Sequence, residues 1–432
     1  MTNINKHLEA GQAMIVATIF FLVISLALIL GLTGPVLRQR AIASDLISSR
    51  QSYFLAEAGL EDVLYRLKTG QPVSSTEVLN IGGGIATTIT TDTSDGKQIV
   101  ATADINEAVR KVRTNITIGS GASFHFGVQA GAGGVIMENT SSILGNVYSN
   151  GRVIGSGPLN NIVRGSIVSA GANGLIEKLH ATSSAYAHTI KESEIDGDAY
   201  YQTIFNTTVL GISYPGSPDQ SVSVLPISDE QIEEWEQVAL DGGTISSPCP
   251  YKITGTATIG PVKINCDLEI TGNNYTVTLN GNVWVKGNII IRNSPTIRAA
   301  SAFGNKGVVA IADNPSNPIT SGVILIENSA VFQGSGSPGS YVLMISGNRS
   351  AQQGWGSLAA MDVKNSVSGN LLVYAGHGEI RLHNSVNLKE VSAYRIRLKN
   401  TAQIVYDTGI TNLLFDSGPS GGYEILNWRE IE

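Results

Sequence analysis

The run from Ala13 to Gly34, which contains no charged side chain, constrains this chain more than any other part of its sequence. About 20 consecutive apolar residues suffice for a helix to cross a lipid bilayer. A cleaved secretory signal peptide would have a shorter apolar region and a basic leader, whereas the leader here offers only Lys6 and His7. We therefore expect a retained transmembrane helix over residues 13–34.

The helical pattern continues beyond the membrane segment. Pro35 should kink the helix or end its first section, because proline lacks an amide hydrogen and clashes with the preceding turn. Heptad spacing then resumes on one face, which predicts an apolar stripe suited to packing. Gly70 and Pro72 close the pattern, so we expect one long helix over residues 12–70. The two rows of the stripe are Ile42, Ser49, Ala56 and Val63, and Leu46, Tyr53, Leu60 and Leu67.

The N-terminal part of the chain, up to the end of this helix, carries several features in a fixed order. A short leader ends in Gly11, the uncharged run follows from Gln12, Pro35 lies beyond it, and the segment from Gln51 to Gly59 comes next. This arrangement resembles type IV pilin-like proteins, specifically the PilX-like minor pilins and the large tip pseudopilin of type II secretion. In the PilX-like group the last segment typically ends in Ala-Glu-Ala-Gly, which is matched by Ala56, Glu57, Ala58 and Gly59.

The resemblance implies how the chain is processed and which partners it has. A prepilin peptidase would cut after Gly11 and methylate the new amine of Gln12. The mature chain would meet other pilins, an inner-membrane platform and an assembly ATPase. Ordinary pilins carry a glutamate at the fifth mature position, where this chain has Val16, as PilX-like and tip subunits often do.

The resemblance also implies a single-pass protein of the cytoplasmic membrane, with its C-terminal part outside the cytoplasm and on the cell surface or a pilus. Arg38 and Arg40 follow the helix and Lys6 precedes it, which opposes the positive-inside tendency. We give the resemblance more weight because these charge counts are small.

Residues 71–121 have the pattern of a small antiparallel sheet. Alternating apolar and polar residues occupy 85–91, 98–103 and 108–117, and the turn Ser94-Asp95-Gly96 is a strong hairpin signal. Such a sheet, packed on the upper half of the long helix, would cover its apolar stripe as in a pilin head.

Beyond residue 121 a repeat of about 18 residues appears, in which an apolar and a polar residue precede Asn and then Ser or Thr. Short apolar strands punctuated by Gly and Asn predict a right-handed β-solenoid, in stretches 122–225 and 244–432. Asparagine suits its corners, since it tolerates left-handed backbone and can stack its amide along the axis. A ligand-binding ladder and glycosylation triplets such as Asn348-Arg-Ser are the alternative interpretations. The predicted corners are Asn139, Asn293, Asn328, Asn365, Asn384 and Asn400.

Residues 226–243 interrupt the repeat with the pattern of a single helix. Ser228 is placed to cap it, Gln231 stands at the capping-box position, and glycines follow its end. We expect this helix to link the two solenoid stretches or cap one of them, with its acidic residues on a solvated face.

The chain has two cysteines, Cys249 and Cys266, which excludes a disulfide-dense miniprotein and a four-cysteine zinc site. Both lie in the part expected outside the cytoplasm, where disulfides persist, so we predict a bridge between them. Two free buried thiols are the alternative.

The sequence offers no recognisable catalytic or cofactor motif. His377, Glu379 and His383 lie close in sequence, but solvated turns explain them. Asp196-Gly-Asp198 and the segment Asp92 to Asp95 each lack the six to eight ligands that calcium takes. We therefore expect no enzyme activity, no cofactor and no metal. A net charge of −7 also argues against nucleic acid.

Taken together, these observations predict a mainly β protein: a transmembrane helix, a small pilin-like sheet and a β-solenoid. We interpret it as a minor pilin or pseudopilin-like filament component that displays the solenoid for tip capping, adhesion or spacing, with a surface glycan or protein as its ligand. The alternatives are a membrane-tethered, polymer-forming solenoid scaffold and a surface β-helix polysaccharide lyase or hydrolase.

Overall fold

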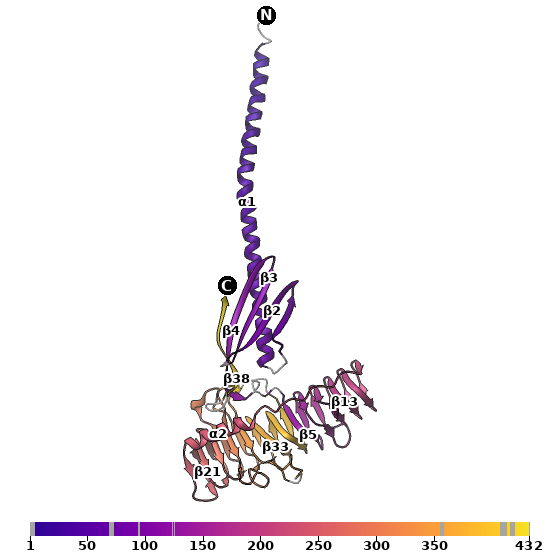
Figure 1. Cartoon of the computed structure of the whole chain (residues 1–432), viewed down its shortest axis with the longest axis vertical. Coiled ribbons are helices and arrows are strands. Elements are labelled where there is room, and N and C mark those ends of the chain that lie inside the picture. The colour runs from indigo at the N-terminus through magenta and orange to yellow at the C-terminus, as the bar shows by residue number, and fades with distance from the viewer. Residues whose placement is uncertain are drawn as a thin grey trace. The chain divides into compact units, whose positions relative to one another are not determined.

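The computed structural model describes residues 5–68, 73–93, 96–122, 124, 126–354, 358–406, 413–414 and 420–431. It is mainly β with one long N-terminal helix, as Figure 1 shows. The chain divides into two compact units. The first comprises residues 1–67, 71–117 and 425–432, and the second comprises 68–70 and 118–424. We describe each unit by itself.

Helix α1 (Asn5–Lys68) is continuous through Pro35. Of the two alternatives expected at Pro35, a kink or the end of a first helical section, the second is therefore wrong. A proline removes one hydrogen bond of the helix, and the flanking turns retain theirs. Every residue from Met14 to Ile47 is exposed. A window of 18 residues within α1 has a mean hydropathy of 2.9, so the helix is long and apolar enough to cross a membrane.

An antiparallel sheet covers the C-terminal part of α1 within the first unit. Its strands β1 (Thr76–Ile81), β2 (Gly84–Thr93), β3 (Gly96–Ile105) and β4 (Ala108–Ala122) pair in chain order. Their packing buries Ala56, Leu60 and Val63, as the apolar stripe predicted. Ile42 and Leu46 remain exposed, because contact between helix and sheet begins near Ser48, which accepts a hydrogen bond from Asn106.

The end of the chain joins this sheet, contrary to the expectation that the second solenoid stretch continues to residue 432. Strand β38 (Ser420–Ile431) pairs with β4. The Thr114 hydroxyl donates to the Asn427 carbonyl, and Arg110 pairs with Glu430 at 3.0 Å. The physical reason is that β4 would otherwise leave a row of backbone groups unpaired, and an additional strand satisfies them.

The second unit is built from parallel strands in two sheets of 20 and 12 strands. We call residues 128–405 the stack. Successive strands pair in register, as where Ile289 faces Ile324 and Ile324 faces Met361. These apolar side chains point inward into one continuous core, while the alternating polar residues point out.

The larger sheet contains β5 (Val128–Met137), β7 (Val147–Ser149), β8 (Val153–Gly155), β10 (Ile167–Ser169), β11 (Leu175–Glu177), β13 (Ala185–Lys191), β15 (Ala199–Phe205), β17 (Ser213–Pro215), β18 (Thr244–Ile245), β19 (Tyr251–Ile253), β21 (Val262–Ile264), β22 (Leu268–Thr271), β24 (Val283–Val285), β25 (Ile289–Arg292), β27 (Val308–Ala312), β28 (Ile324–Glu327), β30 (Val342–Ser346), β31 (Met361–Lys364), β33 (Leu371–His383) and β35 (Glu390–Lys399).

The smaller sheet contains β6 (Ser142–Leu144), β9 (Ile162–Arg164), β12 (His180–Ala181), β14 (Glu194–Ile195), β16 (Thr208–Val209), β20 (Ala257–Ile259), β23 (Thr276–Leu279), β26 (Thr296–Ala299), β29 (Val331–Gln333), β32 (Ser368–Gly369), β34 (Asn387–Leu388) and β36 (Gln403–Val405). A short 3-10 helix (Ser301–Phe303) follows β26, and β37 (Leu413–Leu414) pairs with the end of β4.

The order of the strands in the stack differs from their order in the chain. Strand β5 pairs with β7, which is the next strand of the larger sheet in sequence. It also pairs with β35, where Val391 faces Val128 and Leu398 faces Met137. The chain therefore enters the stack in its middle. Strands β5 to β17 lead outward from there, and we call them the outgoing branch. Strands β18 to β35 form the returning branch, which closes against β5. In Figure 1 the yellow strands accordingly lie beside β5.

Helix α2 (Asp229–Asp241) makes the connection between the two branches. Ser228 caps it and forms a capping box with Gln231, which confirms the local prediction. The helix packs on β21 and β24 and buries Ile232, Trp235 and Ala239. In space, α2 thus lies on the larger sheet of the stack. In sequence, it lies between β17 and β18.

Candidate functional site

The exposed part of α1 is the surface on which the pilin-like interpretation depends. Gly11 and Gln12, the predicted processing residues, belong to the backbone of α1, and their side chains lie outside the described residues. Val16 is 65% exposed and the whole apolar run from Met14 onward is uncovered within its unit. Such a surface suits burial in lipid or against other apolar helices, because contact between apolar side chains and water is unfavourable.

The segment Ala56-Glu57-Ala58-Gly59 packs closely against the antiparallel sheet. Ala56 is fully buried. A Cβ atom added to Gly59 would lie 2.9 Å from both the Ala86 Cβ and the Thr88 Oγ1, so glycine is required for this packing. Glu57 accepts a hydrogen bond from the Tyr53 hydroxyl at 2.7 Å, which raises the pKa of Tyr53. The segment therefore holds the antiparallel sheet of β1–β4, which we call the head sheet, on α1.

The predicted corner asparagines all adopt left-handed backbone, with φ between 51° and 68°. Their amides form a ladder along the stack. Asn384 donates to Asn365 at 2.8 Å, Asn365 donates to Asn328 at 3.0 Å, and Asn400 donates to Asn384 at 3.0 Å. Asn139, near the start of the stack in sequence, donates to Asn400, near its end in sequence, at 2.8 Å, and Asn328 lies 3.5 Å from Asn293. The left-handed backbone predicted for these asparagines is confirmed, and their amides bond one another along the stack.

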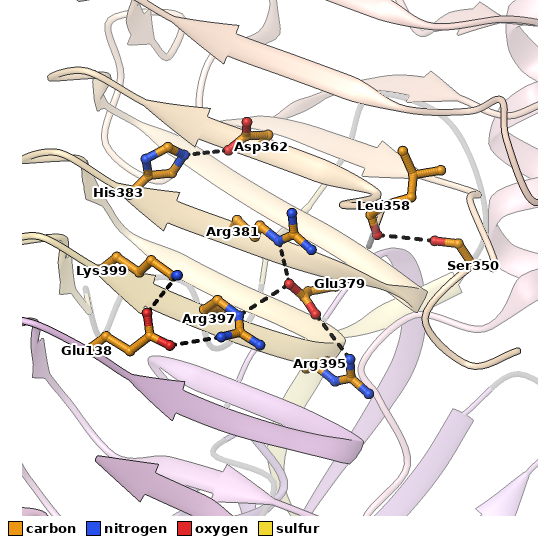
Figure 2. A network of polar contacts seen from close by, with 10 residues as sticks. All are labelled: Glu138, Ser350, Leu358, Asp362, Glu379, Arg381, His383, Arg395, Arg397 and Lys399. Atoms are coloured by element: carbon orange, nitrogen blue, oxygen red, sulfur yellow. Dashed lines mark hydrogen bonds and ion pairs between the residues drawn. The ribbon is translucent and has the colours of Figure 1, made fainter. Parts of the chain in front are cut away.

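A network of charged side chains lies where β33, β35 and β5 meet (Figure 2). Glu379 is fully buried and forms ion pairs with three arginines. These are Arg381, Arg395 at 3.2 Å and Arg397 at 3.4 Å. Glu138, which directly follows β5, pairs with Arg397 at 2.8 Å and with Lys399 at 2.7 Å. The network thus joins β5 and β35, which are the first and last strands of the larger sheet in chain order.

This arrangement corrects the expectation that His377, Glu379 and His383 lie on solvated turns. Glu379 is compensated by three guanidinium groups in the interior. His377 bonds Asp229 at 2.8 Å, and His383 bonds Asp362 at 2.7 Å. The two histidines therefore have separate carboxylate partners. No sequence signal could have located Glu379, because its partners depend on which distant strands become neighbours.

A buried pair of carboxyl groups lies beneath α2, which corrects the expectation that its acidic residues are all solvated. Glu236 is 6% exposed and shares a side-chain hydrogen bond with Asp313. Burial, and then the charge of Asp313, raise the pKa of Glu236 to about 8. Burial also raises the pKa of Asp313. A cavity of about 40 Å³ adjoins the pair and is lined in addition by Asp229, Glu233, Arg349 and His377.

The structure joins Cys249 and Cys266 in a disulfide, with their Cα atoms 5.8 Å apart. The two cysteines are 17 positions apart in sequence and lie between β18 and β22. Of the two calcium candidates, Asp196 lies beside His180, with 3.0 Å between His180 Nε2 and Asp196 Oδ1. Asp95 falls outside the described residues.

No protein-family model matches this chain, and no curated protein is significantly similar to it. Among solved structures, it is similar to the competence-associated pilin ComZ from Thermus thermophilus, with 12% identity and a TM-score of 0.29, over 89% of this chain and 97% of that one. It is also similar to an ice binding protein from an Antarctic bacterium of the Flavobacteriaceae, with 10% identity and a TM-score of 0.20, over 64% of this chain and 80% of that one. Likeness at this level carries no argument about function.

Proposed function

We propose that this chain is a PilX-like minor component of a type IV pilus or a related filament. In this proposal α1 resides in the cytoplasmic membrane before assembly and then packs among the helices of other pilins. The stack, which we interpret as a right-handed β-solenoid, is carried outside as a cap, adhesin or spacer that recognises a glycan or protein. The role is assembly and binding, without catalysis.

The observation that carries the proposal is the two-part character of α1. Its first part is exposed from Met14 to Ile47 and carries no charge up to Gly34, and its second part holds a small antiparallel sheet through the close contact at Gly59. A membrane anchor alone needs about 20 apolar residues and no rigid extension. A helix that packs in a filament and presents a head needs both parts in one continuous rod.

A position at the tip of the filament follows from two further features. Val16 provides no carboxylate to neutralise the amine of a neighbouring subunit, and an uncompensated charge in lipid is costly. The stack takes up most of the chain, from residue 128 to residue 405, and would crowd a filament if repeated at every helical step. Few copies at the start of a fibre satisfy both constraints. The partners would be other pilins, a prepilin peptidase, an assembly platform and its ATPase.

Processing provides the first test of the proposal. Intact-mass measurement of the membrane protein should give a chain that begins at Gln12 with a methylated amine. Gly11→Leu should abolish this cleavage and entry into filaments. Gly31→Leu is the matched control, because a side chain at Gly31 meets nothing within 4 Å and lies beyond the leader. A mature chain that begins at Met1, or one that lacks the helix, would contradict the proposal.

Immunogold labelling of filaments provides the second test. Label should be sparse and concentrated at tips, and Val16→Glu should not convert the protein into a shaft subunit, because the size of the stack is unchanged. Label spread evenly along filaments would show that the placement at the tip is wrong.

One observation favours the alternative of an end-to-end scaffold. The outermost coil of the outgoing branch exposes Phe205, Leu210 and Ile212 at 60%, 67% and 59%, and residues 199–215 contain no charge. Exposed strand edges are usually protected by charges, so this coil suits contact with another strand. Membrane-tethered polymers without pilins in purified material would support the scaffold over the pilus.

A further inference from the structure

Three potential metal ligands converge on the smaller sheet of the outgoing branch. His180 lies on β12 and faces Glu194 on β14, its parallel neighbour, and Asp196 follows β14 directly. One ligand atom from each side chain lies within 4.8 Å of the other two. Glu194 and Asp196 stand two residues apart, so their side chains point to the same face of the strand.

The backbone beneath these three side chains is fixed by the core. Ala181 and Ile195 alternate with the candidate ligands and are fully buried. The strands are also tied by the bonds from His180 N to Asn161 O at 3.1 Å and from Glu194 N to Leu179 O at 2.9 Å. Ligands placed on paired strands keep their separation better than ligands on a loop, which favours a preorganised site.

Other histidines of the stack offer an internal comparison. His188 contacts Asp219 at 3.1 Å and His383 contacts Asp362 at 2.7 Å, each as a pair of one imidazole and one carboxylate. Among the residues that the structure describes, His180, Glu194 and Asp196 form a group of three potential ligands whose ligand atoms all lie within 4.8 Å of one another. Two carboxylates this close repel each other, and a bound dication would remove that repulsion.

We propose that His180, Glu194 and Asp196 bind a divalent transition-metal ion, with Zn²⁺ as its representative. One imidazole nitrogen and two carboxylate oxygens are ligands that zinc accepts, with a water in the fourth position. Calcium takes six to eight oxygen ligands, which this set does not provide. The ion would link consecutive coils near the outer end of the outgoing branch and stabilise them against local unfolding.

The test uses the full chain in detergent micelles, freed of metal by chelation and dialysis. Titration with Zn²⁺, followed by calorimetry, should give one ion per chain and an increase in the melting temperature. His180→Ala and Glu194→Gln should each weaken binding by more than about tenfold, since even indirect partners of zinc contribute about 10–100-fold. Asp196→Asn should have a similar effect.

His188→Ala is the matched control, because it removes an imidazole with a single carboxylate partner on a nearby strand. Its Zn²⁺ affinity should equal that of the unchanged chain. Circular dichroism of each variant distinguishes loss of a ligand from loss of the fold. Absence of Zn²⁺ binding, equal binding in His180→Ala, or Ca²⁺ binding that is as tight and independent of His180 would each overturn the proposal.

Discussion

Raising the pH from about 5 to about 8 should weaken the docking of α2 on the stack. Glu236 of α2 and Asp313, which follows β27, share one buried hydrogen bond. Ionising both would place two negative charges side by side in a poorly solvated interface. The folded protein therefore retains a proton on this pair at a pH at which the unfolded chain has lost it.

The surroundings of the pair determine which effect dominates. Burial is the largest cause of the raised pKa for both groups. For Glu236, the charges of Asp313 and Glu233 add to the increase, and Lys263 opposes it. For Asp313, Arg349 lowers the pKa and Asp229 raises it. The cations are too few and too exposed to reverse the effect of burial, so the proton remains.

The sign and size of the effect follow from proton linkage. Between the ordinary carboxyl pKa of 4.5 and the raised value of about 8, the native state binds more protons than the unfolded state. The free energy of unfolding therefore falls as pH rises, by at most about 1.4 kcal/mol per pH unit for one proton. The contribution is fully present below pH 4.5 and is lost as pH passes about 8. Glu236→Gln, which stays neutral throughout, should flatten this slope.

The assay is urea unfolding of the full chain in micelles at a series of pH values, followed by tryptophan fluorescence. Trp235 is fully buried on α2, and Trp284 donates its Nε1 hydrogen to the Asp313 carbonyl at 3.2 Å, so both report on the interface. Glu234→Gln changes an exposed carboxylate of the same helix that does not line the cavity beside the pair, and it should leave the slope intact. An unchanged slope in Glu236→Gln, or an equal loss of slope in Glu234→Gln, would refute the reasoning.

Three further predictions concern packing, corners and the disulfide. Gly59→Val should destabilise the head by about 1–3 kcal/mol in thermal melts, because even a Cβ would lie 2.9 Å from Ala86 and Thr88; a stability equal to that of the unchanged chain would show that the sheet yields freely. Asn365→Ala should cost about 1–3 kcal/mol, because it removes two amide bonds and places alanine at φ 62°, and Asn365→Gly should recover the backbone part of that loss. Equal stability of the alanine and glycine variants would contradict the role assigned to left-handed backbone. Alkylation of the non-reduced, denatured protein should label neither Cys249 nor Cys266, and reduction should lower stability by about 3 kcal/mol; labelling of both would contradict the bridge.

Local signals in the sequence predicted the elements whose causes are themselves local. The uncharged run and the heptad stripe predicted one long helix over 12–70, and α1 spans Asn5–Lys68. Ser228 and Gln231 predicted the start of α2, because a capping box depends only on residues within one helical turn. The corner asparagines were identified in the same way, since a left-handed residue is selected by its own backbone geometry.

The sequence could not predict which strands become neighbours. Strand β38 completes the head sheet from the far end of the chain, and β5 closes against β35, although the whole remainder of the stack separates these two strands in sequence. A repeat pattern predicts that successive strands stack on one another. It does not indicate the order in which they stack, because every order has the same pattern. The choice depends on the whole set of edges and buried faces that must be satisfied together.

What the sequence alone determined is therefore a membrane-competent helix, a mainly β body and the residues at its turns, because these follow from apolar length, periodicity and backbone preference. Only the tertiary structure placed Glu379 among three arginines, Glu236 against Asp313, and His180 beside Glu194 and Asp196. The charge, burial and ligand geometry of a side chain depend on neighbours from distant parts of the chain. Those neighbours come together only after the strands have paired.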